Sequence, residues 1–135
     1  MKQRTLITFL ICISFSTFAQ QSITQHVYKK VDTVSLALDI YYPPSMEAGK
    51  KYPAMIYFFG GGWNGGSTTQ FEPHAKYFSE RGLICVLADY RVKSRQKTSP
   101  FESLKDAKSA IRYLREHADR LKIDENQIIA AGGSA

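Results

Sequence analysis

One serine near the end of the chain lies in a sequence that suits a nucleophile. Gly132-Gly133-Ser134-Ala135 follows an apolar run and supplies four of the five residues of the pattern Gly-x-Ser-x-Gly. That pattern forms a sharp turn from a strand into a helix, and small neighbours let the strained turn expose the serine hydroxyl. The string alone also occurs in ordinary turns, so its meaning depends on what surrounds it.

A second glycine-rich segment supplies that context. The loop 60–66, Gly-Gly-Gly-Trp-Asn-Gly-Gly, follows the apolar run 54–59. Glycines carry no side chain, so such a loop can present backbone N–H groups to the oxygen of a tetrahedral intermediate. The N–H of the residue after the nucleophile, here Ala135, completes such a site. The two segments together indicate acyl transfer through Ser134.

Strands must hold both segments, and the sequence predicts five of them. Residues 34–41 alternate between apolar and polar side chains, which indicates a strand with one buried face. A strand at 25–31 precedes it, and the short turn Asp32-Thr33 predicts an antiparallel hairpin. Three continuous apolar runs predict strands buried on both faces. These strands are 54–59, 83–88 and 127–131.

Helices are predicted between the buried strands. Residues 71–81 have helical spacing and stop at Gly82. Residues 99–121 carry one apolar stripe, and Ser99-Pro100 with Glu102 suits a capping box. Strands that alternate with helices form a parallel sheet through right-handed crossovers. The predicted fold class is α/β: a mostly parallel sheet with an N-terminal antiparallel hairpin and helices on both faces.

This arrangement resembles the α/β-hydrolase esterases, in particular the acetyl esterase and hormone-sensitive-lipase-like group, which includes carbohydrate esterases. The resemblance covers residues 38–135. It is carried by Asp39-Ile40-Tyr41-Tyr42-Pro43, Phe59-Gly60-Gly61-Gly62-Trp63, Ala88-Asp89-Tyr90-Arg91, 106–114 and 132–135. It implies that Ser134 is the nucleophile and that Gly60, Gly61 and Ala135 supply the oxyanion N–H groups. It also implies a partial α/β-hydrolase fold, with residues 20–135 forming the N-terminal half of the domain.

Two aromatic residues of the glycine loop bear on this resemblance. The family's loop usually begins with histidine, whereas this chain has Phe59, a change that affects loop geometry more than chemistry. Trp63 is a candidate substrate-binding residue facing an acyl or sugar pocket. Simple packing is the alternative, because pockets and cores both favour aromatic side chains.

The resemblance implies a serine carboxylic-ester hydrolase that acts on small acyl esters or acylated carbohydrates without a metal or an organic cofactor. The family's acid and histidine follow the serine in the chain, so this 135-residue chain is expected to be inactive by itself. A non-catalytic binding protein or a defunct fragment on the same scaffold is therefore an alternative. A serine peptidase similar to prolyl oligopeptidase is another, although such peptidases usually lack the triple-glycine loop. Strand 127–131 would also leave an unpaired apolar edge, which predicts poor solubility.

A dinucleotide site is a further alternative. Gly60, Gly62 and Gly65 match G-x-G-x-x-G after a strand, and Asp89 ends the next strand. The third glycine of that motif should open the helix, but residues 67–70 intervene here. Trp63 would also crowd a pyrophosphate, so the esterase interpretation is favoured.

Charged residues elsewhere indicate structural roles. Asp89, Arg91 and Asp106 are interpreted as partners in ion pairs that anchor loops, since buried charges usually serve as partners. The formal net charge is +6, and it falls by two to +4 without Lys2 and Arg4. No organised basic face results, so no nucleic-acid binding is expected. Cys85 is interpreted as apolar packing, and no cysteine or histidine has the spacing of a metal site.

The first nineteen residues have the features of a secretory signal peptide. Lys2 and Arg4 precede the apolar run 6–18, and Thr17-Phe18-Ala19 offers small residues at a cleavage site. The run is short for a membrane span, so an uncleaved anchor is the less favoured alternative. Residues 1–19 therefore predict a secreted or periplasmic protein without stable membrane association after cleavage.

Overall fold

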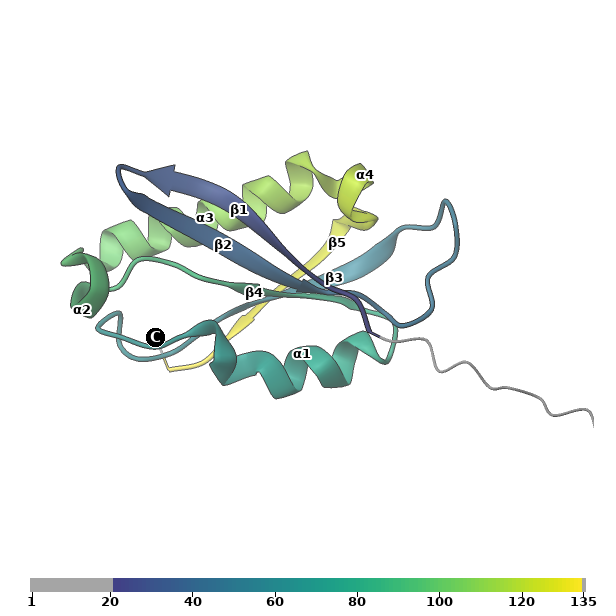
Figure 1. Ribbon diagram of the computed structural model, residues 1–135, viewed down its shortest axis with the longest axis horizontal. Coiled ribbons are helices and arrows are strands. Elements are labelled where there is room, and N and C mark those ends of the chain that lie inside the picture. Colours follow the sequence, from purple (N-terminus) through teal and green to yellow (C-terminus); the bar gives the residue numbers. More distant parts are fainter. Residues whose placement is uncertain (1–20, 135) are drawn as a thin grey trace, which may run out of the picture.

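The computed structural model describes residues 21–134, so the predicted signal peptide and Ala135 lie outside the described residues. The described part is a five-stranded sheet with helices on both faces (Figure 1). The strands are β1 (Ile23–Val31), β2 (Val34–Tyr41), β3 (Tyr52–Phe58), β4 (Ile84–Ala88) and β5 (Ile123–Gly132). The helices are the 3₁₀ turn η1 (Thr68–Phe71), α1 (Glu72–Ser79), α2 (Lys93–Gln96), α3 (Pro100–Glu116) and α4 (Ala118–Leu121). The predicted α/β class is confirmed.

The sheet brings the two glycine-rich segments to one edge. Its strand order is β1-β2-β4-β3-β5. Strand β2 is antiparallel to both β1 and β4, and β3 is parallel to both β4 and β5. Phe58 at the end of β3 pairs with Ala88 on β4 and with Gly132 on β5. The chain therefore leaves all three parallel strands at the same side, where ligand sites of open α/β sheets lie.

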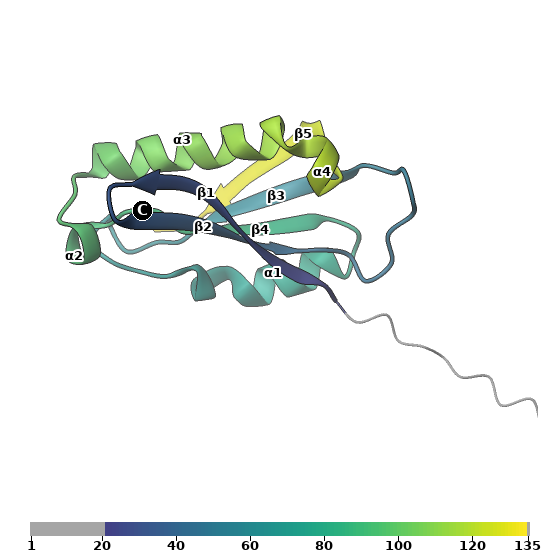
Figure 2. The ribbon, with the colours of Figure 1, turned by 45° about the horizontal axis from the view of Figure 1, so that its top comes forward.

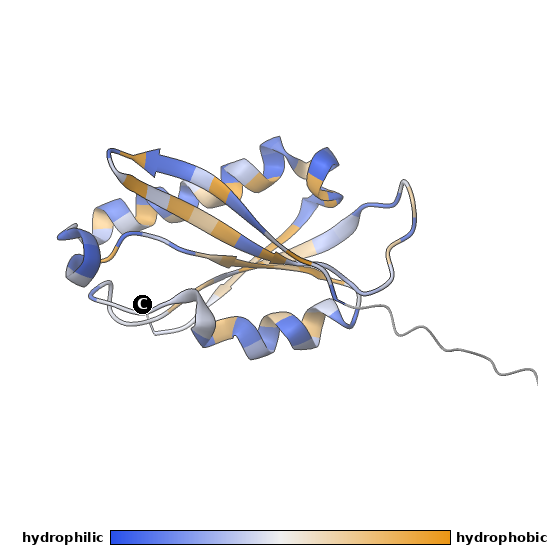
Figure 3. Cartoon of the chain, viewed as in Figure 1, coloured by the Kyte–Doolittle hydropathy of each residue, from blue (hydrophilic) through white to orange (hydrophobic). Residues whose placement is uncertain are grey.

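Each face of the sheet buries a different core. On one face, β-strand residues such as Ile56 and Val86 pack with Ala110 and Leu114 of α3. On the other face, Tyr57 and Ala75 of α1 belong to a second buried cluster. Figure 2 shows α3 and α1 on opposite sides of the sheet, and Figure 3 shows apolar residues along its central strands. The α1 helix is preceded by η1 and ends before Gly82, whose φ of 94° confirms the predicted stop.

The single helix predicted at 99–121 is wrong. Helix α3 ends at Glu116, His117 leaves helical geometry at φ −108° and ψ 19°, and α4 adds one turn. Lys122 then adopts a left-handed conformation (φ 58°) that turns the chain directly into β5. The apolar stripe continued across this break because Ala118 and Leu121 are buried in the same core as α3. β5 consequently starts earlier than the predicted residue 127.

The predicted capping box is also wrong. Ser99 is the N-cap of α3, but its side chain makes no capping hydrogen bond. Glu102 instead pairs with Arg91 at 3.0 Å and with Lys105 at 2.8 Å. A tertiary ion pair thus replaces the local bond. The short helix α2 was not predicted, because one polar turn has no apolar periodicity.

Candidate active site

The turn after β5 has the conformation of a nucleophile turn. Ser134 adopts a positive φ of 58°, which is uncommon for a residue with a side chain. Two residues before it, a Cβ on Gly132 would lie 2.7 Å from the carbonyl oxygen of Phe58. Glycine is therefore required where β5 leaves the sheet beside β3. The strained serine and the small residues before it fit the predicted strand-to-helix turn.

The glycine loop lies directly against this turn. A Cβ on Gly60 would lie 2.1 Å from the carbonyl oxygen of Gly133 and 3.0 Å from the Cβ of Ser134. Real Cβ atoms do not approach other atoms so closely, so the two backbones meet only because residue 60 is glycine. The structure thus brings the two segments together.

Two backbone N–H groups of the loop converge on one oxygen beside the serine. Gly61 donates to the carbonyl oxygen of Ser134 at 2.9 Å, and Gly62 donates to the same oxygen at 3.2 Å. Both glycines have positive φ values, 134° and 58°. Two N–H groups aimed at one point form a cradle for an oxygen that carries negative charge.

The N–H of Gly60 is directed elsewhere. It donates to Oε1 of Gln70 at 2.5 Å. The N–H of Gly60 therefore bonds to Gln70 and not to the serine, whereas the N–H of Gly62, which was not among the predicted donors, bonds to the Ser134 carbonyl oxygen. Ala135 lies outside the described residues, so its predicted donor role stays a prediction.

Phe59 supports the loop by packing. Its ring stacks on Tyr90 with the ring centroids 4.1 Å apart and the planes at 12°. The Tyr90 hydroxyl donates to the Phe59 carbonyl oxygen. On the loop itself, Gly66 has a φ of 114°, and a Cβ there would lie 2.5 Å from the Phe59 ring. A buried aromatic ring thus organises the loop at the position where the family usually has histidine.

The tip of the loop is held by α2. Lys93 donates its backbone N–H to the Trp63 carbonyl at 2.9 Å, and Ser94 donates to Asn64 at 2.8 Å. Asp89 pairs with Arg95 of α2 at 2.6 Å. Helix α2 therefore links the end of β4 to the glycine loop. No sequence pattern predicted this link.

Asp106 is the centre of a buried ion-pair network. It accepts hydrogen bonds from Arg91 Nε at 2.7 Å and from Lys29 Nζ at 2.6 Å. Burial acts to raise the pKa of Asp106, but the hydrogen bonds from Arg91 and Lys29 outweigh burial and hold the pKa below its ordinary value. Ser103 adds a bond to the Arg91 carbonyl at 2.6 Å. The ion pairing predicted for these charged residues is confirmed.

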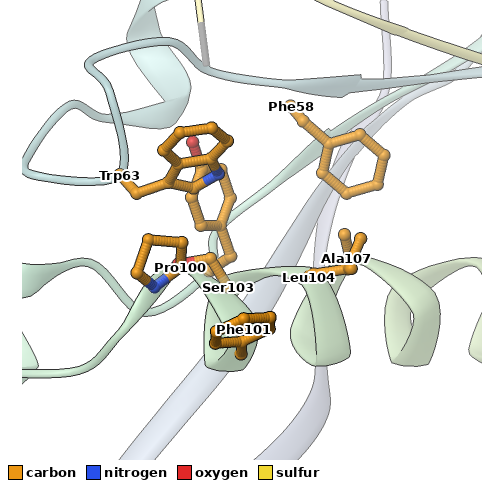
Figure 4. Close-up of a pocket in the computed structure, with 8 residues that line it drawn as sticks. Phe58, Trp63, Pro100, Phe101, Ser103, Leu104 and Ala107 are labelled. Carbon is orange, nitrogen blue, oxygen red and sulfur yellow. The ribbon is translucent and has the colours of Figure 1, made fainter.

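Trp63 lines an apolar cavity beside the glycine loop. The cavity has a volume of about 400 Å³, and its other lining residues include Phe58, Tyr90, Phe101 and Leu104. Figure 4 shows the Trp63 indole at one side of this cavity, across from Phe58 and the first turns of α3. Aromatic linings of this kind suit both a substrate and packing against protein. The role of Trp63 in binding substrate therefore stays a prediction.

The three histidines of the chain contact other side chains. His26 on β1 bonds to the Thr24 hydroxyl at 3.0 Å. His74 packs against the rings of Tyr57 and Phe71, and His117 packs edge-on against Tyr113. Within residues 21–134, no three histidine, cysteine or acidic side chains group as a metal-ion site would require. None of the helices in the same range is long and apolar enough to span a membrane.

Residues 38–135 match the BD-FAE family. The chain belongs to this family. The BD-FAE chain is also similar to two esterases of Mycobacterium tuberculosis. It is 35% identical to Esterase LipQ over 99 residues, which cover 73% of this chain and 23% of LipQ. It is 31% identical to Carboxylesterase NlhH over 98 residues, which cover 71% of this chain and 29% of NlhH.

Solved structures of esterase 2 from Thermogutta terrifontis share the fold of the BD-FAE chain. The native esterase is 45% identical with a TM-score of 0.78, and the match covers 87% of this chain and 41% of the esterase. Other structures show that esterase with bound propionate, with bound butyrate and phosphonylated by cyclosarin. The predicted resemblance to α/β-hydrolase esterases is confirmed, and the chain spans less than half the length of each of these relatives.

Proposed function

We propose that this sequence belongs to a serine carboxylic-ester hydrolase in which Ser134 is the nucleophile. One observation carries the proposal: the N–H groups of Gly61 and Gly62 both donate to the backbone carbonyl oxygen of Ser134, so they are directed at the nucleophile turn. A cradle of this geometry stabilises the oxyanion of acyl transfer, and each donor contributes about 3 kcal/mol to lowering the barrier. Gly61 and Gly62, together with the N–H of Ala135, are the proposed oxyanion donors.

The proposed reaction proceeds in two acyl-transfer steps. The Ser134 hydroxyl oxygen forms a bond to the ester carbonyl carbon while its proton passes to a general base. The carbonyl oxygen becomes an oxyanion held by Gly61 and Gly62. The bond to the alcohol then breaks as the base returns the proton to the leaving oxygen, and water releases the acid from Ser134 by the same sequence. The base and its acidic partner follow the serine in the chain order of this fold.

Small acyl esters, including acylated carbohydrates, are the proposed substrates. The relatives named LipQ and NlhH are esterases, and the esterase from T. terrifontis binds propionate and butyrate, which are short-chain acids. The signal-peptide pattern of residues 1–19 supports secretion or export to the periplasm as part of the proposal.

Covalent labelling of the full-length protein tests this function. A fluorophosphonate probe should label the wild type at Ser134, because the esterase from T. terrifontis is phosphonylated by cyclosarin. Ser134→Ala should abolish labelling and lower kcat for p-nitrophenyl acetate by about a million-fold. Ser109→Ala removes an exposed α3 hydroxyl that donates to the Lys105 carbonyl and accepts from Arg112 on the same helix, so it should leave both readouts unchanged.

The alternatives predict different results. A binding protein on this scaffold would fold and show neither labelling nor turnover. A serine peptidase would be labelled but would cleave a prolyl p-nitroanilide in preference to p-nitrophenyl acetate. Turnover by folded Ser134→Ala would eliminate Ser134 as the nucleophile. Release of acetate from acetylated xylan would support the carbohydrate class, and hydrolysis of p-nitrophenyl acetate alone would favour simple acyl esters.

A further inference from the structure

We propose that Gln70 is a positioning residue for the oxyanion cradle. In this role its side chain holds the peptide unit between Phe59 and Gly60, so that the N–H groups of Gly61 and Gly62 are directed at the substrate oxygen. The inference rests on the proposed esterase function and adds to it a residue outside both glycine segments.

A single peptide unit at the root of the loop is held at both of its polar ends. The N–H of Gly60 donates to Oε1 of Gln70 at 2.5 Å. The carbonyl of the same peptide unit belongs to Phe59 and accepts the Tyr90 hydroxyl. The two side chains come from different elements, η1 and the end of β4, so together they fix the rotation of this peptide plane.

The Gly60 N–H has no strand partner to replace Gln70. The ladders of β3 with β4 and β5 end at Phe58, two residues earlier. Gly60 is buried, and a buried N–H without an acceptor is costly. If the Gln70 carbonyl is removed, this N–H must find another acceptor. The nearby carbonyl oxygen of Ser134 already accepts hydrogen bonds from Gly61 and Gly62.

The residues that follow need such an anchor. Gly61 has a φ of 134° and Gly62 a φ of 58°, conformations that glycine adopts easily and also leaves easily. A run of glycines does not by itself hold its N–H groups in one direction. An anchor at Gly60 converts this freedom into a fixed orientation, which electrostatic stabilisation of an oxyanion requires.

Gln70 is itself held close to the nucleophile turn. The next residue, Phe71, stacks on Tyr57 with centroids 5.4 Å apart. A Cβ on Gly133 would lie 3.5 Å from the Phe71 ring. The element that carries Gln70 thus contacts the turn that carries Ser134. A shift of η1 relative to the serine turn would therefore change the position of the Gly61 and Gly62 N–H groups.

Three variants of the full-length protein test the proposal. Gln70→Leu removes the acceptor at nearly constant volume and should lower kcat for p-nitrophenyl acetate about tenfold, with KM changed by less than about twofold. Gln25→Leu is the matched control, because Gln25 bonds to Asp39 on the exposed hairpin. It should leave kcat unchanged. Gln70→Leu should also slow fluorophosphonate labelling of Ser134 by the same factor, since the phosphonyl oxygen uses the same cradle.

Gln70→Glu separates positioning from a structural role. The protonated carboxyl is isosteric with the amide and retains the carbonyl acceptor, whereas the carboxylate places negative charge beside the developing oxyanion. Because Gln70 is exposed, the new carboxyl should titrate near the ordinary glutamate value of about 4.3. The kcat of Gln70→Glu relative to wild type should therefore fall as the pH rises from about 4 to about 6 and level off above that. A ratio that does not vary with pH would contradict the proposal.

The possible failures are distinguishable. If the wild type is not labelled at Ser134, the proposed function fails. If the wild type is labelled and Gln70→Leu is labelled at the same rate, the function stands and the role of Gln70 is refuted. A loss of kcat in Gln70→Leu that matches a loss of folded protein by circular dichroism would also refute positioning.

Discussion

Gly61 donates its backbone N–H to the carbonyl oxygen of Ser134 at 2.9 Å. This bond joins the loop after β3 to the turn after β5, the two segments on which the proposed function rests. The carbonyl of the serine lies in the cradle that the proposed mechanism gives to a substrate oxygen. The glycine loop thus directs its N–H groups at the turn that carries Ser134, as the proposed mechanism requires.

In the full-length protein, Gly60→Ala should abolish the proposed esterase activity. The new Cβ would lie 2.1 Å from the Gly133 carbonyl oxygen, so the loop and the nucleophile turn must separate. We expect kcat to fall at least about a hundred-fold, as for loss of an oxyanion donor. Gly49→Ala is the control: Gly49 also has a positive φ (78°), but its Cβ would meet nothing within 4 Å. It should cost about 1 kcal/mol of stability and leave kcat unchanged. Equal activities of the two variants would contradict the prediction.

Asp106→Asn should strongly destabilise the fold. The variant keeps the size of the side chain but leaves Lys29 without its carboxylate partner and leaves Arg91, which is 9% exposed, with Glu102 alone. Breaking a buried ion pair in this way costs about 3–5 kcal/mol, measurable by urea unfolding. Asp119→Asn removes a carboxylate that is 92% exposed from its pair with Lys51 and should have no comparable effect.

The same network also predicts a pH dependence. Because the folded pKa of Asp106 lies below its unfolded value, its contribution to stability is present above about pH 4 and is lost as the pH falls through the folded pKa. The stability difference between wild type and Asp106→Asn should therefore be constant from about pH 7 to pH 5 and shrink below about pH 4. A difference that grows on acidification would contradict this assignment.

The isolated chain 20–135 should self-associate through β5. Within residues 21–134 this strand pairs with β3 alone and lies at the end of the sheet, and Ile129 on it is 48% exposed. An exposed apolar edge strand pairs readily with another chain. Ile129→Lys should increase the monomer fraction in sedimentation velocity. Tyr77→Lys adds the same charge on α1, where Tyr77 is 52% exposed. If it has an equal effect, net charge and not the edge is responsible.

Local patterns were sufficient for the architecture. Apolar runs such as 83–88 and the alternation at 34–41 predicted the parallel strands and the hairpin, because burial on two faces gives a continuous apolar run and burial on one face gives an alternation. Gly82 ended its helix as expected. The helix break at His117 was not predictable in this way, since the apolar stripe continues through it to Leu121.

The candidate site likewise has features that the sequence predicts and features that only the structure shows. Glycine at 60 and 132 and the serine between small residues are visible in the sequence, because the absence of a side chain is a local property. The sequence alone thus determined that a glycine loop and Ser134 meet at the carboxyl edge of a parallel sheet. Only the tertiary structure decided which N–H groups face the serine. That choice depends on Gln70 and Tyr90, whose contacts join residues distant in the chain and leave no periodic trace.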